Sequence, residues 1–191
     1  MTQKISIVGD GIIGKMVAVA LHDLNFDVTV FHNEQSKKTN ERYFSINLLS
    51  RHLFEDCNIW PAIKTKGTNP YCKIITWDNL QPEEVLFESC NIGESDLAYV
   101  ISESNILNAI NSKIQKKSIK FESINNLNDN LTKYDYAINT INNNHSSTCS
   151  ETRYKTNYEQ KAIVMNIDVD NSSNVAYQKF LDGQILGLIP I

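Results

Sequence analysis

A glycine-rich turn close to the N-terminus constrains the fold of this chain more than any other stretch. Residues 5–8 read Ile-Ser-Ile-Val, a run rich in β-branched side chains, which favours a strand. Gly9, Gly11 and Gly14 follow in the spacing G-x-G-x-x-G, and apolar residues then recur at helical spacing from Met16 to Leu24. The order strand, tight turn, helix predicts the start of a dinucleotide-binding unit.

Each glycine of this turn has a separate physical role in such a unit. Gly9 permits the sharp turn, Gly11 lets the backbone come close to a pyrophosphate, and Gly14 lets the helix pack closely on the strand. The phosphates then meet the helix N-terminus, where Ile12 and Ile13 lie. The alternative interpretation is a Rossmann-like core that binds no nucleotide.

The end of the second predicted strand, residues 26–31, is the next informative position. An acidic side chain about twenty residues past the glycines usually binds the adenosine ribose. Here the residues are His32, Asn33 and Glu34. A histidine can make one hydrogen bond to a ribose hydroxyl but lacks the two oxygens of a carboxylate. His32 and Asn33 are therefore candidate cofactor-binding residues, and a solvated loop histidine is the alternative for His32.

Composition and charge limit the classes of partner. The chain has 191 residues, of which 41% are hydrophobic and 21% charged, and this indicates a globular protein with a real core. The formal net charge of −4, together with the lack of a basic stripe, argues against nucleic acid as a partner.

Cysteine usage and hydropathy indicate the compartment. Four cysteines are widely scattered, with no C-x-x-C pair and no histidine at metal-ligand spacing. They predict free thiols in a reducing compartment and no metal site. Because the sequence enters a core strand at once and has no long apolar run, we expect a cytoplasmic protein. Loose, peripheral association with a membrane surface stays open.

The pattern of the remaining chain predicts further helices and strands. A helix is expected near residues 48–55 with Leu49, Leu53 and Phe54 on one face, ended by the Asn58-Ile59 step and Pro61. Ser104 is the expected N-cap of a second helix with an apolar face of Leu107, Ile110 and Ile114. The expected strands are a hairpin or a pair of neighbouring strands at 73–78 and 84–87, then 119–124, 134–141, 161–169 and 175–180.

These elements predict an α/β fold in which strands inserted after the β-α-β start form a second layer beside the Rossmann-like sheet. The chain stops within the apolar run 185–191, so we expect it to be cut short within a second domain.

Several stretches together resemble the FAD-dependent aromatic-ring monooxygenases of ubiquinone biosynthesis, which are p-hydroxybenzoate hydroxylase-like flavoproteins. The resemblance is carried along the whole chain by G-D-G-I-I-G at 9–14, R-Y-F-S-I-N-L-L-S-R at 42–51, I-I-T-W-D at 74–78, L-A-Y-V-I-S-E-S-N-I-L-N-A-I at 97–110 and A-Y-Q-K-F-L-D-G-Q-I-L-G-L-I-P-I at 176–191.

The resemblance implies a Rossmann-like FAD-binding domain interleaved with an incomplete β-rich substrate domain. The FAD-binding part is then expected at residues 1–70 and again at 101–160, strands of the substrate domain at 71–100, and the start of a truncated substrate-domain sheet at 161–191.

The resemblance also implies a cofactor, an electron donor and a substrate class. FAD would be bound, NAD(P)H would reduce it, and a small aromatic, polyprenyl-phenol-like substrate would be hydroxylated. Gly9, Gly11 and Gly14 would face the FAD pyrophosphate, His32 would stand where a ribose-binding glutamate usually lies, and Arg42 would reach the flavin side. A guanidinium fork suits phosphate or ribose oxygens; an exposed loop arginine is the alternative.

Two departures from the family pattern affect the expected activity. A G-A-D-G-like signature corresponds to residues 139–142 here, with Ile141 in place of the aspartate and Asn142 in place of the glycine. The family's C-terminal half, with its G-D-A-A-H-like motif, has no counterpart in the chain. We therefore expect a truncated and inactive monooxygenase or, as the alternative, a non-catalytic remnant that needs a separately encoded C-terminal half. An NAD(P)-dependent dehydrogenase is disfavoured because no acid-base pair stands out.

Overall fold

The computed structural model describes residues 2–32, 41–79, 83–126, 131–141, 158–170 and 173–191, and all statements on structure concern these residues. The helices are α1 (Ile12–Asp23), α2 (Leu48–Asp56), α3 (Trp60–Thr65) and α4 (Glu103–Ile114), with short 3-10 turns at Ser89–Ile92, Ile124–Asn126 and Leu131–Lys133. The strands are β1 (Lys4–Val8), β2 (Asp27–His32), β3 (Tyr43–Asn47), β4 (Asn69–Tyr71), β5 (Lys73–Asp78), β6 (Val85–Glu88), β7 (Ala98–Ser102), β8 (Lys120–Ser123), β9 (Tyr136–Asn139), β10 (Val175–Leu181) and β11 (Gln184–Leu188).

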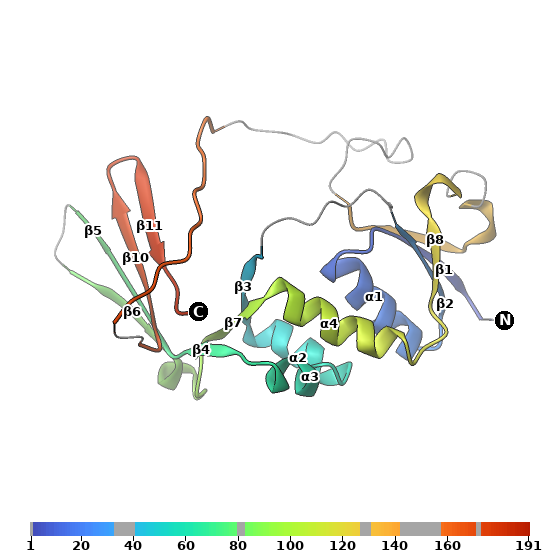
Figure 1. Ribbon diagram of the computed structural model, residues 1–191, viewed down its shortest axis with the longest axis horizontal. Coiled ribbons are helices and arrows are strands. Elements are labelled where there is room, and N and C mark those ends of the chain that lie inside the picture. The colour runs from blue at the N-terminus through green and yellow to red at the C-terminus, as the bar shows by residue number, and fades with distance from the viewer. Residues whose placement is uncertain (1, 33–40, 80–82, 127–130, 142–157, 171–172) are drawn as a thin grey trace.

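The first predicted strand is part of a four-stranded parallel sheet, and the predicted turn and helix follow this strand. The order of the sheet is β8-β2-β1-β9, and each neighbouring pair runs parallel. The chain passes from β1 through α1 to the adjacent β2, which confirms the predicted β-α-β unit. Figure 1 shows α1 and α4 alongside this sheet; α3 contacts α4, and α2 contacts α3.

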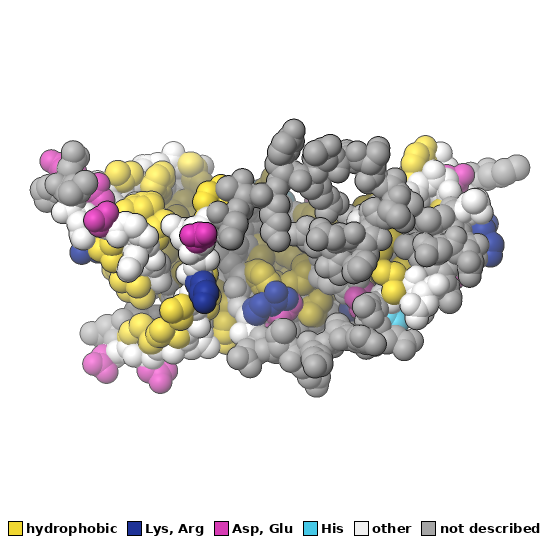
Figure 2. Space-filling model, turned by 90° about the horizontal axis from the view of Figure 1, so that it is seen from above, with side chains coloured by type: hydrophobic (Ala, Val, Ile, Leu, Met, Phe, Trp, Pro, Cys, Tyr) yellow, Lys and Arg dark blue, Asp and Glu magenta, His cyan; other side chains and the backbone are white. Residues whose placement is uncertain are grey.

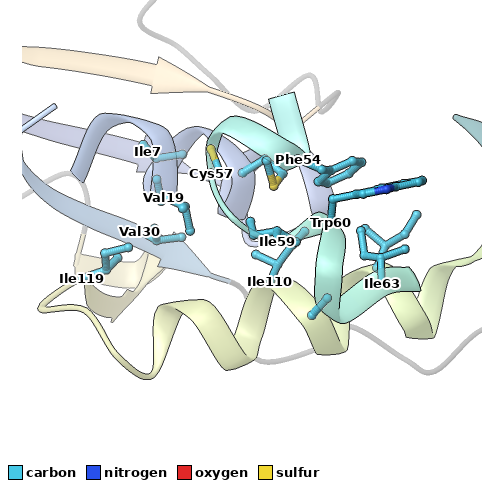
Figure 3. Close-up of a cluster of buried hydrophobic side chains, with 14 of the residues drawn as sticks. Ile7, Val19, Val30, Phe54, Cys57, Ile59, Trp60, Ile63, Ile110 and Ile119 are labelled. Atoms are coloured by element: carbon cyan, nitrogen blue, oxygen red, sulfur yellow. The ribbon is translucent and has the colours of Figure 1, made fainter. Parts of the chain in front are cut away.

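The main hydrophobic core lies between the parallel sheet and the helices (Figure 3). Alternate residues of β1 and β2 point to this side, so that Ile7 and Val30 are fully buried against Val19 of α1 and Ile110 of α4. Trp60 and Ile63 of α3 extend the same cluster. The core therefore fixes the position of α1, and with it the glycine turn that precedes this helix.

A three-stranded antiparallel sheet, in the order β3-β7-β4, lies beside this core. The prediction for α2 was partly wrong: Phe54 is buried, but the side chains of Leu49 and Leu53 are 79% and 46% exposed. The neighbouring β3 and α3 decide which side of this short helix is covered. Pro61 does not end α2 but lies in the first turn of α3, where a missing N–H costs nothing.

The start of α4 also differs from the prediction. Its N-cap is Ser102, whose hydroxyl accepts a hydrogen bond from the Asn105 amide at 3.2 Å, so the predicted cap at Ser104 was wrong. The chain leaves β7 directly into the helix, and the cap falls at the last residue of the strand. Ile110 is buried as expected, whereas Leu107 and Ile114 are only partly buried.

A second four-stranded sheet, of mixed direction, has the order β11-β10-β5-β6. The predicted hairpin is confirmed by antiparallel pairing of β5 with β6, and β10 pairs parallel with β5 and antiparallel with β11. The strand predicted at 161–169 was wrong, since these residues form no strand and are exposed. Figure 1 shows the two four-stranded sheets at opposite ends of the molecule.

Hydrophobic side chains gather on the surface at the end that holds the mixed sheet (Figure 2). Those that are at least 41% exposed on its strands are Val85, Leu86, Phe87, Phe180, Ile185, Leu186 and Leu188. Among the described residues, no helix is long and apolar enough to cross a membrane.

Candidate dinucleotide site

The glycine turn lies at the carboxyl end of β1, between the ends of β2 and β9. The Gly9 amide donates to the Phe31 carbonyl of β2 at 2.8 Å, and the Thr140 amide donates to the Val8 carbonyl at 2.9 Å. The next strand along the chain, β2, lies on one side of β1, whereas β9 lies on the other. Ligands of open parallel sheets bind at the carboxyl ends of the strands, where the order reverses in this way.

Gly9 and Gly14 are required by the geometry of the turn. The φ angle of Gly9 is 114°, a backbone conformation that residues other than glycine rarely adopt. An added Cβ would also lie 2.5 Å from the Thr140 hydroxyl. A Cβ on Gly14 would lie 1.9 Å from the Gly9 carbonyl oxygen. The predicted roles in turning the chain and in close packing of α1 thus match the contacts of these two glycines.

Gly11 is in a different environment, because nothing lies within 4 Å of the position that its Cβ would take. It is the N-cap of α1, and no side chain caps the first turn of this helix. The amides of Ile12, Ile13 and Gly14 belong to that turn, where N–H groups have no partner within the helix. The first turn has no acidic residue, so its amides and the helix dipole favour an anion.

Of the two residues predicted at the end of β2, His32 is described and Asn33 lies outside the described residues. His32 is the last residue of β2 and is partly exposed. Because Phe31, the residue before it, pairs with Val8, His32 lies at the same edge of the sheet as the glycine turn. The structure therefore brings together Gly9, Gly11, Ile12, Ile13, Gly14 and His32.

Arg42 lies just before β3 and is held by Glu103, the first residue of α4. Its Nε donates to the Glu103 carboxylate at 2.8 Å, a second guanidinium nitrogen pairs with the other oxygen, and its carbonyl accepts from the Glu103 amide at 2.7 Å. The guanidinium also lies 5.5 Å from the centre of the Phe44 ring. The hydrogen bonds from Arg42 lower the pKa of Glu103, although its burial opposes the shift. The predicted contact of Arg42 with the flavin stays a prediction.

Thr140 is a residue of this site that we did not single out from the sequence. It follows β9, and its hydroxyl donates to the Val8 carbonyl at 2.9 Å and lies 3.4 Å from the Gly9 carbonyl oxygen. Next to it, the Ile141 amide donates to the Asn139 side chain at 3.0 Å. The sequence indicates this segment by its position after a predicted strand and by its correspondence to the G-A-D-G-like signature at 139–142. It does not indicate the contact of Thr140 with Val8, because pairing of β9 with β1 links residues far apart in the chain.

Other chemistry is scarce in the described part of the chain. It contains no group of three or more His, Cys, Asp or Glu side chains that could hold a metal ion. Cys57, Cys72 and Cys90 are free thiols, and Cys149 lies outside the described residues. Burial raises the pKa of the Cys57 thiol, with a smaller contribution from Asp23, which makes this thiol less reactive.

Two further aromatic residues make edge-to-face contacts with other rings. Trp77 contacts Tyr177, and Tyr99 contacts Trp60.

Comparison with known proteins shows similarity to a hydroxylase, to an oxygenase and to a protein described as a probable FAD-dependent monooxygenase. No protein-family model matches the chain. An alignment of 113 positions, which covers 56% of this chain, is 24% identical to 3-demethoxyubiquinol 3-hydroxylase of Escherichia coli (strain K12) and covers 29% of that protein.

Solved structures show the same fold. PqsL of Pseudomonas aeruginosa, described as a probable FAD-dependent monooxygenase, superposes with a TM-score of 0.51 at 14% identity, over 63% of this chain and 32% of PqsL. The tetrameric form of 2-methyl-3-hydroxypyridine-5-carboxylic acid oxygenase gives a TM-score of 0.50 at 15% identity, over 64% of this chain and 31% of that protein. The chain thus spans about a third of the length of these proteins and has part of their fold, with the expected Rossmann-like sheet.

Proposed function

We propose that the chain binds FAD and forms the FAD-binding part of an aromatic-ring monooxygenase of the type that acts on ubiquinone precursors. The observation that supports this most is the glycine turn at the carboxyl edge of the parallel sheet, with an open position at Gly11 and an uncapped helix behind it. The similarity to 3-demethoxyubiquinol 3-hydroxylase and the fold shared with PqsL support FAD over other dinucleotides.

The residues of the turn would bind the pyrophosphate of FAD. The amides of Ile12, Ile13 and Gly14 would donate to its oxygens, and the absence of a side chain at Gly11 would let the phosphates approach. His32 would lie near the adenosine ribose. When bound, the flavin supplies the redox chemistry of ring hydroxylation, with NAD(P)H as the proposed electron donor and a small aromatic, polyprenyl-phenol-like molecule as the proposed substrate.

A second candidate is a non-catalytic half-protein that acts with a separate polypeptide or at a membrane surface. The observation that favours it is the uncovered apolar mixed sheet, on which Phe87 and Ile185 are 53% and 64% exposed. Monomeric soluble proteins rarely leave contiguous apolar patches of this kind uncovered. In this candidate, ring hydroxylation would need residues that the chain itself does not supply.

Titration with FAD, FMN and NAD+, followed by isothermal calorimetry, tests the proposed function. FAD should bind at one equivalent, and FMN, which lacks the pyrophosphate bridge, at least about tenfold more weakly. His32→Glu should tighten FAD binding by a few fold, because a carboxylate offers two acceptors to the ribose. Failure of the wild-type chain to bind FAD would overturn the proposal, whereas preference for NAD+ would indicate a dehydrogenase.

A further inference from the structure

The glycine turn needs support from its neighbours, because glycines do not hold a conformation by themselves. Gly9, with a φ of 114°, and the exposed Gly11 gain no restriction from a side chain. Preorganised binding groups, in contrast, depend on contacts that lock them in place. A neighbouring side chain is therefore expected to hold the turn in place.

Thr140 makes the contacts that such a role requires. Its hydroxyl donates to the Val8 carbonyl at 2.9 Å and lies 3.4 Å from the carbonyl oxygen of Gly9. The hydroxyl would be 2.5 Å and 2.9 Å from Cβ atoms placed on Gly9 and Gly14, so it occupies the space that these glycines leave. Thr140 contacts the turn and the start of α1 at the same time, from the residue that follows β9.

The backbone reinforces this arrangement. The Thr140 amide donates to the same Val8 carbonyl at 2.9 Å, and this carbonyl has two lone pairs with which to accept both bonds. The Asn139 side chain accepts a hydrogen bond from the Ile141 amide, and this bond links the residues before and after Thr140. Val8 is the residue immediately before the turn, so its carbonyl fixes the direction in which the chain enters Gly9.

We propose that Thr140 is a positioning residue of the FAD site, whose hydroxyl holds the glycine turn in the geometry in which the first amides of α1 face the pyrophosphate. This inference rests on the proposed function, since it assigns a role within the same site. Thr140 itself touches neither the flavin nor the substrate in this proposal. It acts through Val8, Gly9 and Gly14.

The test compares Thr140→Ala, which removes the hydroxyl, with Thr140→Ser, which keeps it. Thr65→Ala is the matched control, because the Thr65 hydroxyl also donates to a backbone carbonyl, that of Pro61 at 2.8 Å, on an exposed part of α3. The affinities for FAD and for ADP, which carries the pyrophosphate without the flavin, are measured well below the melting temperature of each variant.

Thr140→Ala should weaken the binding of FAD and of ADP by the same factor, about fivefold or more, which is the range expected for one lost hydrogen bond. Thr140→Ser should restore affinity to within about twofold, and Thr65→Ala should bind like the wild type. Unchanged affinity of Thr140→Ala, whatever its melting temperature, would overturn the positioning role and leave the proposed function standing. A wild-type chain that binds neither FAD nor ADP would instead overturn the proposed function, and the positioning role with it.

Discussion

At the scale of single residues, the three glycines of the turn serve different purposes, and the structure separates them. Gly9 and Gly14 are needed by the fold, since an added Cβ meets other atoms at 2.5 Å and 1.9 Å. Gly11 is not needed in this way: its φ of −70° suits any residue, and its surroundings are open. The proposed contact with a pyrophosphate would give a reason for a glycine at this position that the fold itself does not give.

Alanine substitutions should divide these roles. Gly14→Ala should destabilise the chain by about 3 kcal/mol or more, because the backbone of Gly9 must move to admit the methyl group. Gly11→Ala should change the free energy of unfolding by less than about 1 kcal/mol and weaken FAD binding at least about tenfold. Thermal melts and FAD titrations of both variants check this. Normal FAD binding by Gly11→Ala would place the pyrophosphate elsewhere.

The pair of Arg42 and Glu103 predicts a dependence of stability on pH. The hydrogen bonds from Arg42 lower the pKa of Glu103 in the folded state, so the pair stabilises the fold above the unfolded pKa, about 4.3. This contribution is lost as the pH falls through the folded pKa. Because the Arg42 side chain is 60% exposed, the effect should be at most about 1 kcal/mol.

Denaturant unfolding between about pH 5 and pH 3 measures this contribution. The wild type should lose more stability than Glu103→Gln over this interval, because the variant has already lost the charge of the pair. Glu94→Gln, at an exposed glutamate near the 3-10 turn after β6, is the control and should follow the wild type. Equal losses in the wild type and in Glu103→Gln would show that the pair does not contribute.

At the scale of elements, local sequence patterns predicted the helices and strands that are stabilised mainly by residues close to them in the chain. The β1 to α1 unit and the β5–β6 hairpin were predicted because strand propensity, turn residues and helical spacing agree within each of them. The exposure of Leu49 and the absence of a strand at 161–169 were not predictable in this way. Both depend on which distant segments lie nearby, as does the contact of Thr140 with Val8 in the candidate site.

The cap of α4 gives a prediction at this scale. Ser102 accepts from the Asn105 amide and fills the N-cap position, whereas Ser104 lies within the first turn and is exposed. Ser102→Ala should therefore cost about 1 kcal/mol of stability, the usual loss of an N-cap, and Ser104→Ala should cost less than about 0.5 kcal/mol. Denaturant unfolding of the two variants compares them directly. A larger effect at Ser104 would restore it as the cap.

At the scale of the whole molecule, the two ends differ in how well they are covered. The parallel sheet is covered by α1 and α4, and Ile5, Ile7, Val28 and Val30 on this side are buried. In β11, the neighbouring residues Ile185 and Leu186 are 64% and 51% exposed. Consecutive residues of a strand point to opposite faces, so both faces of this strand carry exposed apolar side chains.

Uncovered apolar strands favour association, because burial of their side chains removes apolar surface from water and an outer strand offers unpaired backbone groups. The chain should therefore self-associate, and sedimentation velocity over about 1–100 µM should show species larger than a monomer. Replacing Leu86 and Ile185 together by lysine should shift the distribution towards the monomer. Leu24→Lys is the control, because Leu24 is 68% exposed but lies after α1, away from the mixed sheet. A wild-type chain that stays monomeric over this range would show that the exposed strands tolerate water, and the half-protein candidate would then lose the observation that favours it.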